Sequence, residues 1–319
     1  MSRSHPVLRA LGKHFHGMLR RSSALSKYYL LSVGAVLRAV ANVPLRENII
    51  NSVVSVDWGE IRFPARRVDV TDRVAVRLVP HAGEFDFRGL FHKRLRYEEQ
   101  VFELLAPRVP KYDVIVEIGA NVGIYSIFFG ETTRRSESHT RIYVFEPSRR
   151  AFFRLLENLE ENQLENVVPF NIAVAGSTGF RRFFEPVGHL TNGSLRKDFA
   201  EIFSQTVRST MVPSITGVEM GVLLGDAKSV LLKIDVEGAE VEVLKSLREL
   251  IVARRPDLLL EVLEPFENVL NGLTFLRQHY RFFVISDKGL EERGAFEADP
   301  RFRDYWLAPR DDRATTTEQ

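Results

Sequence analysis

Two stretches of the sequence decide the fold: Val-Ile-Val-Glu-Ile-Gly-Ala-Asn-Val-Gly at residues 114–123 and Leu-Leu-Lys-Ile-Asp-Val-Glu-Gly-Ala-Glu at residues 231–240. In each, an apolar strand runs into a turn that carries an acidic residue and a glycine, and a helix is expected to follow. In an open α/β sheet such turns lie at the carboxyl ends of strands, where ligands bind. The pair therefore predicts a binding site as well as a fold class.

The segments around these stretches alternate between strand and helix. Strands are predicted at 113–118, 141–145, 167–174, 229–235, 257–262 and 281–285, and helices at 119–129, 149–162, 239–252 and 266–279. This order and spacing predict parallel βαβ units and a doubly wound α/β sheet. The strands around Phe282 and Tyr305 have no full helix between them, so we expect an antiparallel pair at one edge. Residues 175–210, rich in Gly, Ser and Thr, are expected to be irregular.

Four regions are predicted along the chain. Residues 1–48 form a basic helical extension, 49–94 a β-rich lead-in, 95–310 the main α/β domain and 311–319 a disordered polar tail. In the lead-in, the apolar pattern predicts short strands, first at Val53, Val54 and Val56, then at Ile61 and Phe63, and then at Val74, Val76, Leu78 and Val79. The four residues Asp57 to Glu60 resemble the turn of a hairpin between these strands. A helix is predicted from Arg96 to Leu105.

The charge of the chain is unevenly distributed. The net charge of +2 comes from 44 Lys/Arg and 42 Asp/Glu, of which residues 1–48 hold eight basic residues and one acid. The remaining 36 basic and 41 acidic residues leave 49–319 at −5, which does not favour nucleic-acid binding. In 1–48 the apolar and basic residues near the start fall on opposite helix faces. Such a helix packs on the protein or a partner, or lies on an anionic membrane surface.

No segment supplies a convincing membrane span or signal peptide. The apolar stretch from Tyr28 to Val43 is interrupted by polar residues and falls short of the ~20 apolar residues that a span needs. We therefore expect a cytoplasmic protein, with peripheral membrane contact through residues 1–48 as one reading. The chain also has no cysteine, which excludes disulfides, cysteine-ligated metals and a thiolate nucleophile. The oligomeric state is not predicted.

The first turn is unsuited to a dinucleotide phosphate. The dinucleotide fingerprint G-x-G-x-x-G fails because Asn121 and Ile124 replace its second and third glycines, and no phosphate-binding Lys follows. What stands there is Glu117, Gly119 and Gly123, and the carboxylate would repel a pyrophosphate. It suits a ligand with a cationic centre and an amino group, such as S-adenosylmethionine.

Glu146 gives a second indication of the ligand. It ends the strand after the glycine turn, where an acid can accept hydrogen bonds from two ribose hydroxyls. This position serves both NAD and S-adenosylmethionine sites, so alone it does not discriminate. With the failed fingerprint it favours S-adenosylmethionine over NAD.

The motifs together resemble one enzyme family. Lys-Ile-Asp-Val-Glu-Gly-Ala-Glu at 233–240, the glycine turn at 117–123 and Val-Phe-Glu-Pro at 144–147 are similar to the FkbM methyltransferases, as are Asn-Gly-Ser-Leu at 192–195 and Val-Pro at 212–213. The resemblance implies a seven-stranded, Rossmann-like class I methyltransferase sheet, S-adenosylmethionine as donor, and O-methylation of a saccharide, glycolipid or related small metabolite.

The predicted site has a donor side and an acceptor side. The residues predicted to bind S-adenosylmethionine are Glu117, Gly119, Asn121, Gly123, Glu146 and Ala173. An acceptor hydroxyl must lose its proton, so a carboxylate or histidine near it helps. The predicted catalytic residues are Asp235, Glu237 and His189, with Glu240 expected to begin its helix. Glu261 could add an oxygen ligand for magnesium, but no metal is predicted because no histidine accompanies these acids.

Two other functions fit the same fold. A nucleotide-cofactor, NAD-type oxidoreductase is disfavoured by the missing fingerprint. A catalytically inactive binding protein is disfavoured by the complete set of acids, since a site that loses its function tends to lose these first. The acceptor itself is not readable from the sequence, although residues 175–210 are expected to shape its pocket.

Overall fold

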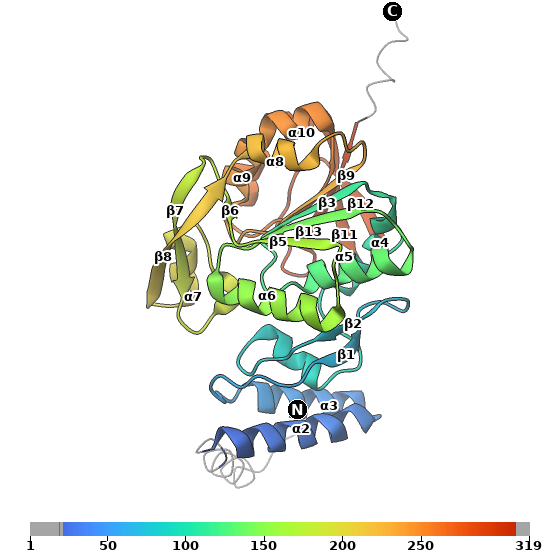
Figure 1. The fold of residues 1–319 in the computed structure, drawn as a ribbon, viewed down its shortest axis with the longest axis vertical. Coiled ribbons are helices and arrows are strands. Elements are labelled where there is room, and N and C mark those ends of the chain that lie inside the picture. Colours follow the sequence, from blue (N-terminus) through green and yellow to red (C-terminus); the bar gives the residue numbers. More distant parts are fainter. Residues whose placement is uncertain (1–18, 20–21, 311–319) are drawn as a thin grey trace, which may run out of the picture. The chain divides into compact units, whose positions relative to one another are not determined.

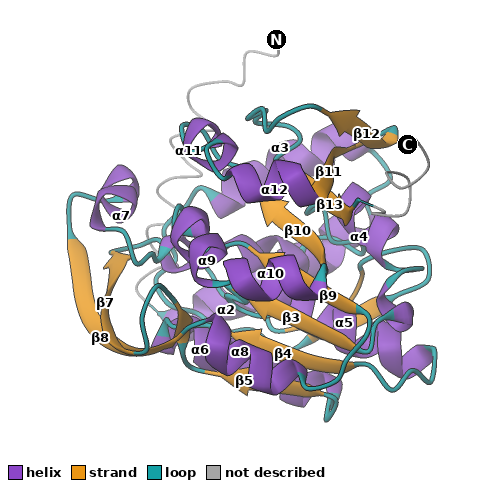
Figure 2. Cartoon of the chain, turned by 90° about the horizontal axis from the view of Figure 1, so that it is seen from above, coloured by secondary structure: helices purple, strands orange, loops and turns teal. Residues whose placement is uncertain are grey.

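The computed structural model describes residue 19 and residues 22–310. The chain divides into two compact units, residues 1–97 and residues 98–319. Figure 1 shows the fold, and Figure 2 shows it turned by 90°.

The first unit joins helices to a hairpin. Its elements are α2 (Ser23–Ala39), α3 (Val43–Val54), β1 (Arg66–Asp69), β2 (Ala75–Leu78) and the 3-10 helix η1 (Phe85–Leu90). Both α-helices begin at polar caps, since the side chains of Ser22 and Asn42 accept hydrogen bonds from the backbone of the first turn. The helices bury one face in a core shared with the loops between them and η1, formed by Leu30, Leu37, Ile50, Val53, Trp58, Ile61, Phe63, Ala82, Phe87, Leu90 and Phe91.

Two predictions for this unit are wrong. Val53 and Val54 lie in the last turn of α3 and not in a strand, because valine is buried equally well by a helix face. Residues 57–60 do not turn a hairpin. Asp57 instead accepts a hydrogen bond from the Gly59 amide at 2.9 Å, and the hairpin is β1–β2, paired antiparallel. The basic amphipathic helix predicted near the start of the chain lies almost wholly outside the described residues.

The second unit contains a large sheet with the order β12-β11-β13-β10-β9-β3-β4-β5. Its strands are β3 (Val114–Ile118), β4 (Arg141–Phe145), β5 (Val167–Phe170), β9 (Val230–Ile234), β10 (Asp257–Glu261), β11 (Tyr280–Ser286), β12 (Gly289–Arg293) and β13 (Asp304–Pro309). The five strands from β10 to β5 are parallel, and β13, β11 and β12 join antiparallel. The predicted doubly wound, Rossmann-like α/β sheet is confirmed.

Helices cover both faces of this sheet. They are α4 (Glu99–Leu105), α5 (Ile124–Arg135), α6 (Arg149–Asn162), α8 (Gly217–Leu224), α9 (Glu240–Ser246), α10 (Arg248–Arg254), α11 (Glu267–Asn271) and α12 (Thr274–His279), with the 3-10 helix η2 (Val109–Lys111). Helices α4, α5 and α6 lie on one side and α8, α9 and α10 on the other (Figure 1). Alternate side chains of a strand point to opposite faces, so β3 and β9 supply apolar residues to both layers.

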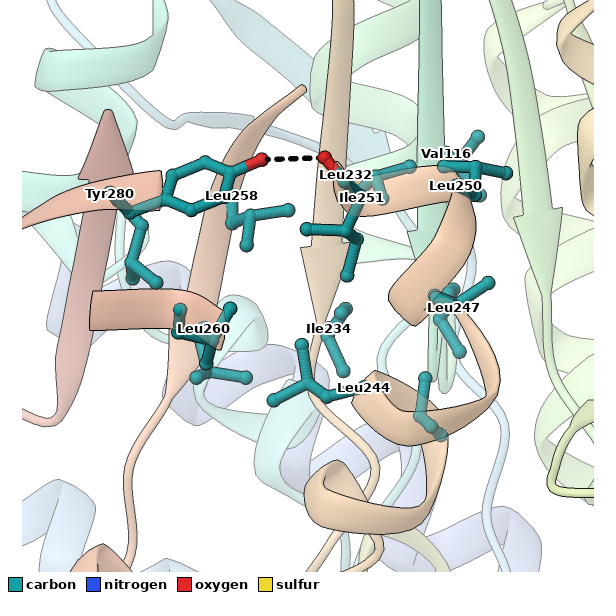
Figure 3. Packing of buried hydrophobic residues seen from close by; sticks show 14 of the residues in the cluster. Val116, Leu232, Ile234, Leu244, Leu247, Leu250, Ile251, Leu258, Leu260 and Tyr280 are labelled. Atoms are coloured by element: carbon teal, nitrogen blue, oxygen red, sulfur yellow. Dashed lines mark hydrogen bonds between the residues drawn. The ribbon is translucent and has the colours of Figure 1, made fainter. Parts of the chain in front are cut away.

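The core on the α8–α10 side is dense and aliphatic. Val116, Leu232, Ile234, Leu258 and Leu260 from three neighbouring strands pack against Leu244, Leu247, Leu250 and Ile251. Figure 3 shows this packing, with the Tyr280 hydroxyl donating a hydrogen bond to the Ile251 carbonyl at 3.4 Å. This layer fixes the strands whose carboxyl ends carry the two turns.

One edge of the sheet differs from the prediction. The sheet has eight strands and not seven, because β12 follows β11 through a short turn and pairs with it antiparallel. The strands around Phe282 and Tyr305 do pair antiparallel, as predicted, but β13 also pairs with β10 and therefore lies inside the sheet. The helices predicted at 239–252 and 266–279 are each divided in two, near Leu247 and Gly272.

The region from 167 to 215 was predicted least well. The predicted strand 167–174 ends as β5 at Phe170 and resumes as β6 (Ala173–Val174) in another sheet, and Asn171 between them donates to the carbonyls of Glu146 and Pro147. The stretch predicted to be irregular contains strand β7 (Gly179–Pro186), the 3-10 helix η3 (Leu190–Asn192) and helix α7 (Lys197–Phe203). With β8 (Val207–Ile215) these strands form a three-stranded sheet in the order β6-β8-β7.

Candidate active site

The two turns that opened the sequence analysis lie side by side. Strands β3 and β9 are parallel neighbours with Ile118 opposite Ile234, so both turns leave the same edge of the sheet. The Asp235 amide donates a hydrogen bond to the Ile118 carbonyl at 3.0 Å, which extends the pairing into the turns. The first turn (residues 119–123) and the second turn (residues 235–239) therefore lie together at the carboxyl ends of the strands, where ligands bind in open α/β sheets, and we call this place the crevice edge.

Gly119 is the closest point between the two turns. Its φ of +87° is in the left-handed region, and a Cβ there would lie 1.7 Å from the Asp235 carbonyl oxygen, so no other residue fits without a backbone shift. Asn121 and Gly123 also have positive φ, at 53° and 86°. The amides of Gly119 and Ala120 both donate to the Phe145 carbonyl, which ties this turn to the end of β4.

Helix α6 supports the first turn from behind. A Cβ on Gly123 would lie 2.4 Å from Cδ1 of Leu155, so this glycine permits close packing of the helix. One turn further along α6, the buried side chain of Asn158 donates to the Val122 carbonyl at 2.8 Å. The first turn is thus held almost entirely through its main chain.

Glu146 joins the first turn to the end of β4. One carboxylate oxygen accepts the Asn121 amide and the other accepts the Ser148 amide, both at 2.7 Å. Burial raises the pKa of Glu146 to about 7, although these two hydrogen bonds act in the opposite direction. Each oxygen retains a lone pair for a further donor. Beside it, the Oδ1 atom of Asn121 is buried and has no hydrogen-bond partner among the described residues.

Glu117 points into the interior. It precedes Ile118 in β3 and is only 1% exposed, and it accepts a hydrogen bond from the Ser126 hydroxyl at 2.6 Å. Burial raises its pKa to about 8, against the charge of Lys233 and the hydrogen bond from Ser126. Its carboxyl group therefore lies under the turn, toward α5.

Lys233 is a buried residue beside both turns for which the sequence analysis gave no role. It is 3% exposed, lies opposite Glu117 in the sheet, and its Nζ donates to Asp235 Oδ2 at 2.9 Å. The same Nζ lies 4.3 Å from the centroid of the Tyr125 ring. A lysine between leucine and isoleucine in a buried strand was the available signal, since lysine is almost never fully buried unless paired.

The second turn is organised by side chains. Glu237 and Gly238 have φ of 54° and 87°. Glu240 begins α9, as predicted, and its buried carboxylate accepts the amides of Val236 and Gly238, both at 3.1 Å. Burial raises the pKa of Glu240 to about 7.

Residues of η3 and the following loop reach this turn from the other side. The Ser194 hydroxyl donates to the Glu237 carbonyl at 2.7 Å, and the Asn192 side chain bonds the Glu237 carboxylate. The Thr191 carbonyl accepts a 3.4 Å hydrogen bond from the Asn121 side chain. Residues 191–194 therefore touch both turns, although the sequence analysis used 192–195 only as part of the resemblance.

Further carboxyl groups continue the crevice along β10 and β13. Glu261 and Asp304 are paired in register, and Arg303 lies 3.2 Å from the Glu261 carboxylate. Burial, and then the charge of Asp235, raise the pKa of Glu237 and Glu261 well above the usual range. Within residue 19 and residues 22–310, no group of three or more acidic or histidine side chains is arranged to hold a metal ion.

His189 and Ala173 lie apart from the carboxylates. His189 is exposed just before η3, and its ring centroid lies 6.1 Å from that of Phe203. In the part of the chain that the structure describes, no hydrogen bond or ion pair joins this ring to Asp235 or Glu237. Ala173 is buried in β6 opposite Ser214, in a small cluster with Phe183 and Val212.

Comparison with known proteins gives a family for residues 117–283. This segment, 167 of the 319 residues, matches the sequence model described as the methyltransferase FkbM domain. The hexuronic acid methyltransferase AglP of Haloferax volcanii is 30% identical over 154 residues, which are 48% of this chain. The match covers 57% of that relative, so the chain spans little more than half its length.

Two solved structures have a similar but distant fold. The methyltransferase FkbM from Methylobacillus flagellatus KT has a TM-score of 0.40 at 15% identity, over 61% of this chain and 43% of that one. The SAM-dependent methyltransferase from Agrobacterium tumefaciens has a TM-score of 0.37 at 11% identity, over 73% of this chain and 66% of that one.

Proposed function

Because the chain belongs to the FkbM methyltransferase family, we propose that it transfers a methyl group from S-adenosylmethionine to a hydroxyl of a saccharide, glycolipid or related small metabolite. Residues 117–283 form a methyltransferase domain whose donor is S-adenosylmethionine. The observation that carries the proposal is the crevice edge at the ends of β3, β4 and β9. There the first turn, in which Asn121 Oδ1 has no hydrogen-bond partner among the described residues, lies beside the carboxyl groups of the second turn.

On the donor side, the residues fit S-adenosylmethionine. Glu146 is held by two amides with lone pairs to spare, which suits the two ribose hydroxyls. The unpartnered Oδ1 of Asn121 is an acceptor for an amino or hydroxyl group of the ligand. Gly119 and Gly123 let the backbone approach closely, and Glu117 and Ala173 complete the proposed set.

On the acceptor side, the carboxyl groups serve to align the hydroxyl and remove its proton. Methyl transfer is an in-line displacement, so most of the rate comes from the alignment of oxygen, methyl carbon and sulfur. Asp235 and Glu237 project from the second turn beside Gly119, and they are the proposed catalytic pair. His189, which is exposed just before η3, is the weaker candidate for the base. It would have to reach the acceptor hydroxyl from the solvent side.

A carboxylated sugar is the acceptor class that we favour. The relative from Haloferax volcanii is named for methylation of a hexuronic acid. In this chain, the guanidinium of Arg196 lies 4.8 Å from the Phe266 ring centroid, and both border the second turn, where Gly238 packs against Phe266. The Arg196 guanidinium already donates to the Asp198 carboxylate, so a sugar carboxylate would share or displace that pair, and the Phe266 ring offers a surface for an apolar sugar face. Residues 175–210 supply the remaining acceptor contacts in this proposal.

Labelled methyl transfer tests the proposed reaction. The protein is incubated with methyl-labelled S-adenosylmethionine and fractionated glycans, glycolipids and small metabolites, with uronic acids and their neutral sugar counterparts as a matched pair. We expect label in the uronic acid fraction and loss of transfer in Asp235→Ala. Transfer to no fraction would support an inactive binding protein. Thermal stabilisation by NAD but not by S-adenosylmethionine would contradict the proposal in favour of an oxidoreductase.

The proposal places the protein in the cytoplasm, with peripheral membrane contact through residues 1–48. The outer face of α2 exposes Leu25 at 56%, Tyr28 at 73% and Val36 at 63%, and the first acidic residue of the chain is Glu47. Apolar side chains among basic ones suit an anionic lipid surface. Among the described residues, no helix is long and apolar enough to cross a bilayer.

Sedimentation with liposomes tests this contact. The triple variant Leu25→Ser, Tyr28→Ser and Val36→Ser removes the apolar face without touching the buried side of α2. We expect it to reduce binding to anionic liposomes several-fold, whereas Val269→Ser, a similarly exposed position on α11, should not. Equal sedimentation of the wild type and the triple variant would exclude this contact.

A further inference from the structure

The most unusual charge in the methyltransferase domain is Lys233. It lies in the middle of the sheet, and its alternation along β9 places it on the same face as Asp235, two residues later. Its Nζ donates to Asp235 Oδ2 at 2.9 Å, and the Lys233 side chain is 3% exposed whereas that of Asp235 is 21% exposed. The ion pair therefore has one end in the core and the other in the crevice.

Carboxyl groups face Lys233 from several of the elements around it. Besides Asp235 on its own strand, these are Glu117 on β3, Glu98 at the start of α4 and Asp304 on β13. Burial alone would lower the pKa of the Lys233 ammonium, but these acids and the hydrogen bond to Asp235 raise it. Lys233 therefore carries a fixed positive charge.

Tyr125 fixes the position of this charge. Its ring lies under Nζ, 4.3 Å from centroid to nitrogen, as in a cation–π contact. The ring stacks on Phe102 with centroids 4.5 Å apart, and its hydroxyl donates to Glu98. Since α4 and α5 clamp the ring, the ammonium has one well-defined position, and Asp235 is held with it.

Glu237 has different surroundings from Asp235. Its carboxylate is bonded by the Asn192 amide and faces Asp235, Glu240, Glu261 and Arg303. Arg303 is engaged with Glu261 at 3.2 Å. Unlike Asp235, Glu237 thus has no buried lysine of its own, and the nearby acids favour its taking up a proton.

We propose that Lys233 is a positioning residue that holds the Asp235 side chain in one place beside the first turn, and that Glu237 is the group that accepts the proton of the acceptor hydroxyl. This rests on the proposed methyl transfer. The acceptor oxygen forms a bond to the methyl carbon as the carbon–sulfur bond breaks. The electron pair of the broken bond stays on sulfur. The hydroxyl proton passes to the Glu237 carboxylate, while Asp235 orients the acceptor or the donor by a hydrogen bond.

The test compares pH–rate profiles of three variants. Glu237→Gln should lower kcat by about 10²- to 10⁴-fold, with donor affinity within about twofold of the wild type, and should abolish the acid limb of the kcat profile. Lys233→Met should lower kcat by roughly 10- to 100-fold, with donor affinity within about twofold of the wild type, and should keep the acid limb, because it releases the Asp235 side chain and leaves Glu237 in place. Lys245→Met, the same change at an exposed position on α9, should alter neither.

Three outcomes would overturn the inference. They are an unchanged acid limb in Glu237→Gln, an unchanged kcat or a lost acid limb in a folded Lys233→Met, and a Glu237→Gln effect confined to KM. If Lys233→Met does not fold, the double variant Lys233→Met with Asp235→Asn removes both charges of the pair and is measured in its place. It should keep an acid limb that depends on Glu237, and loss of that limb would also overturn the inference.

A measurement without an acceptor separates this inference from the proposed function. Carbon-13 NMR of the labelled carboxyl group of Glu237 follows its titration directly in the ligand-free protein. Glu237 should titrate above the usual carboxyl range, because burial and the neighbouring acids favour its protonated form. Such a titration with no methyl transfer to any fraction would refute the function alone. Methyl transfer with Glu237 titrating at or below the usual carboxyl range would refute the inference alone.

Discussion

The two turns at the crevice edge are built in different ways. The first turn uses its main chain: three residues with positive φ, amides that donate to Phe145 and Glu146, and a carbonyl held by Asn158. The second turn uses side chains: Glu240 caps its amides and Lys233 holds Asp235. A turn built from main chain keeps its shape through local backbone geometry, whereas a turn built from buried charge depends on the balance of its neighbours.

The largest effect is expected where the two turns meet. Gly119→Ala places a methyl group on the Asp235 carbonyl in a left-handed backbone, so we expect loss of about 3–5 kcal/mol of unfolding free energy and of donor binding. Gly289→Ala is the matched control, because Gly289 has φ of 96° with nothing within 4 Å of its Cβ position. It should destabilise by roughly 1 kcal/mol in urea unfolding. Equal effects would mean that the turns are not in contact.

The buried carboxyl groups predict a pH-dependent stability. Burial raises the pKa of Glu117 to about 8, and those of Glu146 and Glu240 to about 7, from an unfolded value near 4.5. At a pH between the unfolded and folded pKa values, the folded state binds more protons than the unfolded state. The free energy of unfolding is therefore greatest near pH 5 and falls as the pH rises toward 8. From pH 5 to pH 8 we expect a fall of several kcal/mol in the ligand-free protein, since each unit of pKa difference is worth about 1.4 kcal/mol and Glu117 has the widest difference.

Urea unfolding at several pH values checks this dependence. Glu117→Gln should flatten the fall, because it removes the group with the widest pKa difference. Glu219→Gln is the control, since hydrogen bonds from Thr178 and Thr216 lower the Glu219 pKa to about 2, outside the measured window. A slope that rises toward pH 8, or one that Glu117→Gln leaves unchanged, would contradict the electrostatic description of the site.

The supports of the two turns give a smaller and more specific contrast. Asn158→Ala leaves the Val122 carbonyl without its donor and should destabilise by about 1–3 kcal/mol while weakening S-adenosylmethionine binding in calorimetry. Ser194→Ala removes the donor to the Glu237 carbonyl and should cost about 1 kcal/mol, with a fall in kcat but little change in donor affinity. If Asn158→Ala lowered kcat alone and Ser194→Ala weakened donor binding, the first turn would not be the donor side and the second would not be the acceptor side.

The smallest expected effect sets the baseline for the others. Thr216 caps α8 in a reciprocal capping box with Glu219, away from both turns. Thr216→Ala should lower the melting temperature by a few degrees, equivalent to about 1 kcal/mol, and leave donor affinity and kcat unchanged. A change in kcat as large as that of Ser194→Ala would mean that general loss of stability, and not the second turn, explains the Ser194 result.

The parallel part of the sheet was predictable because its strands are long, apolar and separated by whole helices. Residues 114–118, 141–145 and 149–162 have the expected structure with nearly the expected bounds. The β7–β8 hairpin was missed because one of its faces is exposed and the other buries little beyond Phe183 and Val212, so no clear alternation remains in the sequence. The error at Val53 was avoidable, since Asn42 and Pro44 are start signals for the helix that contains it.

The candidate site was predictable in its residue types but not in their directions. Acids at strand ends identified Glu146, Asp235 and Glu237, and the crevice brings the turns that carry them together. That Glu117 points into the core follows from its pairing with Ser126 on α5, which only the packed fold brings near. The role of Lys233 likewise depends on Tyr125, about a hundred residues earlier, and no local pattern connects the two.

Glu98 has a practical consequence for anyone who divides the chain. It is the first residue of the second unit and the hydrogen-bond acceptor of the Tyr125 hydroxyl. An expression fragment that begins a residue or two later would remove the carboxylate that helps hold the ring beneath Lys233. A fragment begun at Glu98 itself would add a charged amino terminus beside it. Fragments of the methyltransferase domain should therefore retain several residues before Glu98, with that segment unchanged and untagged.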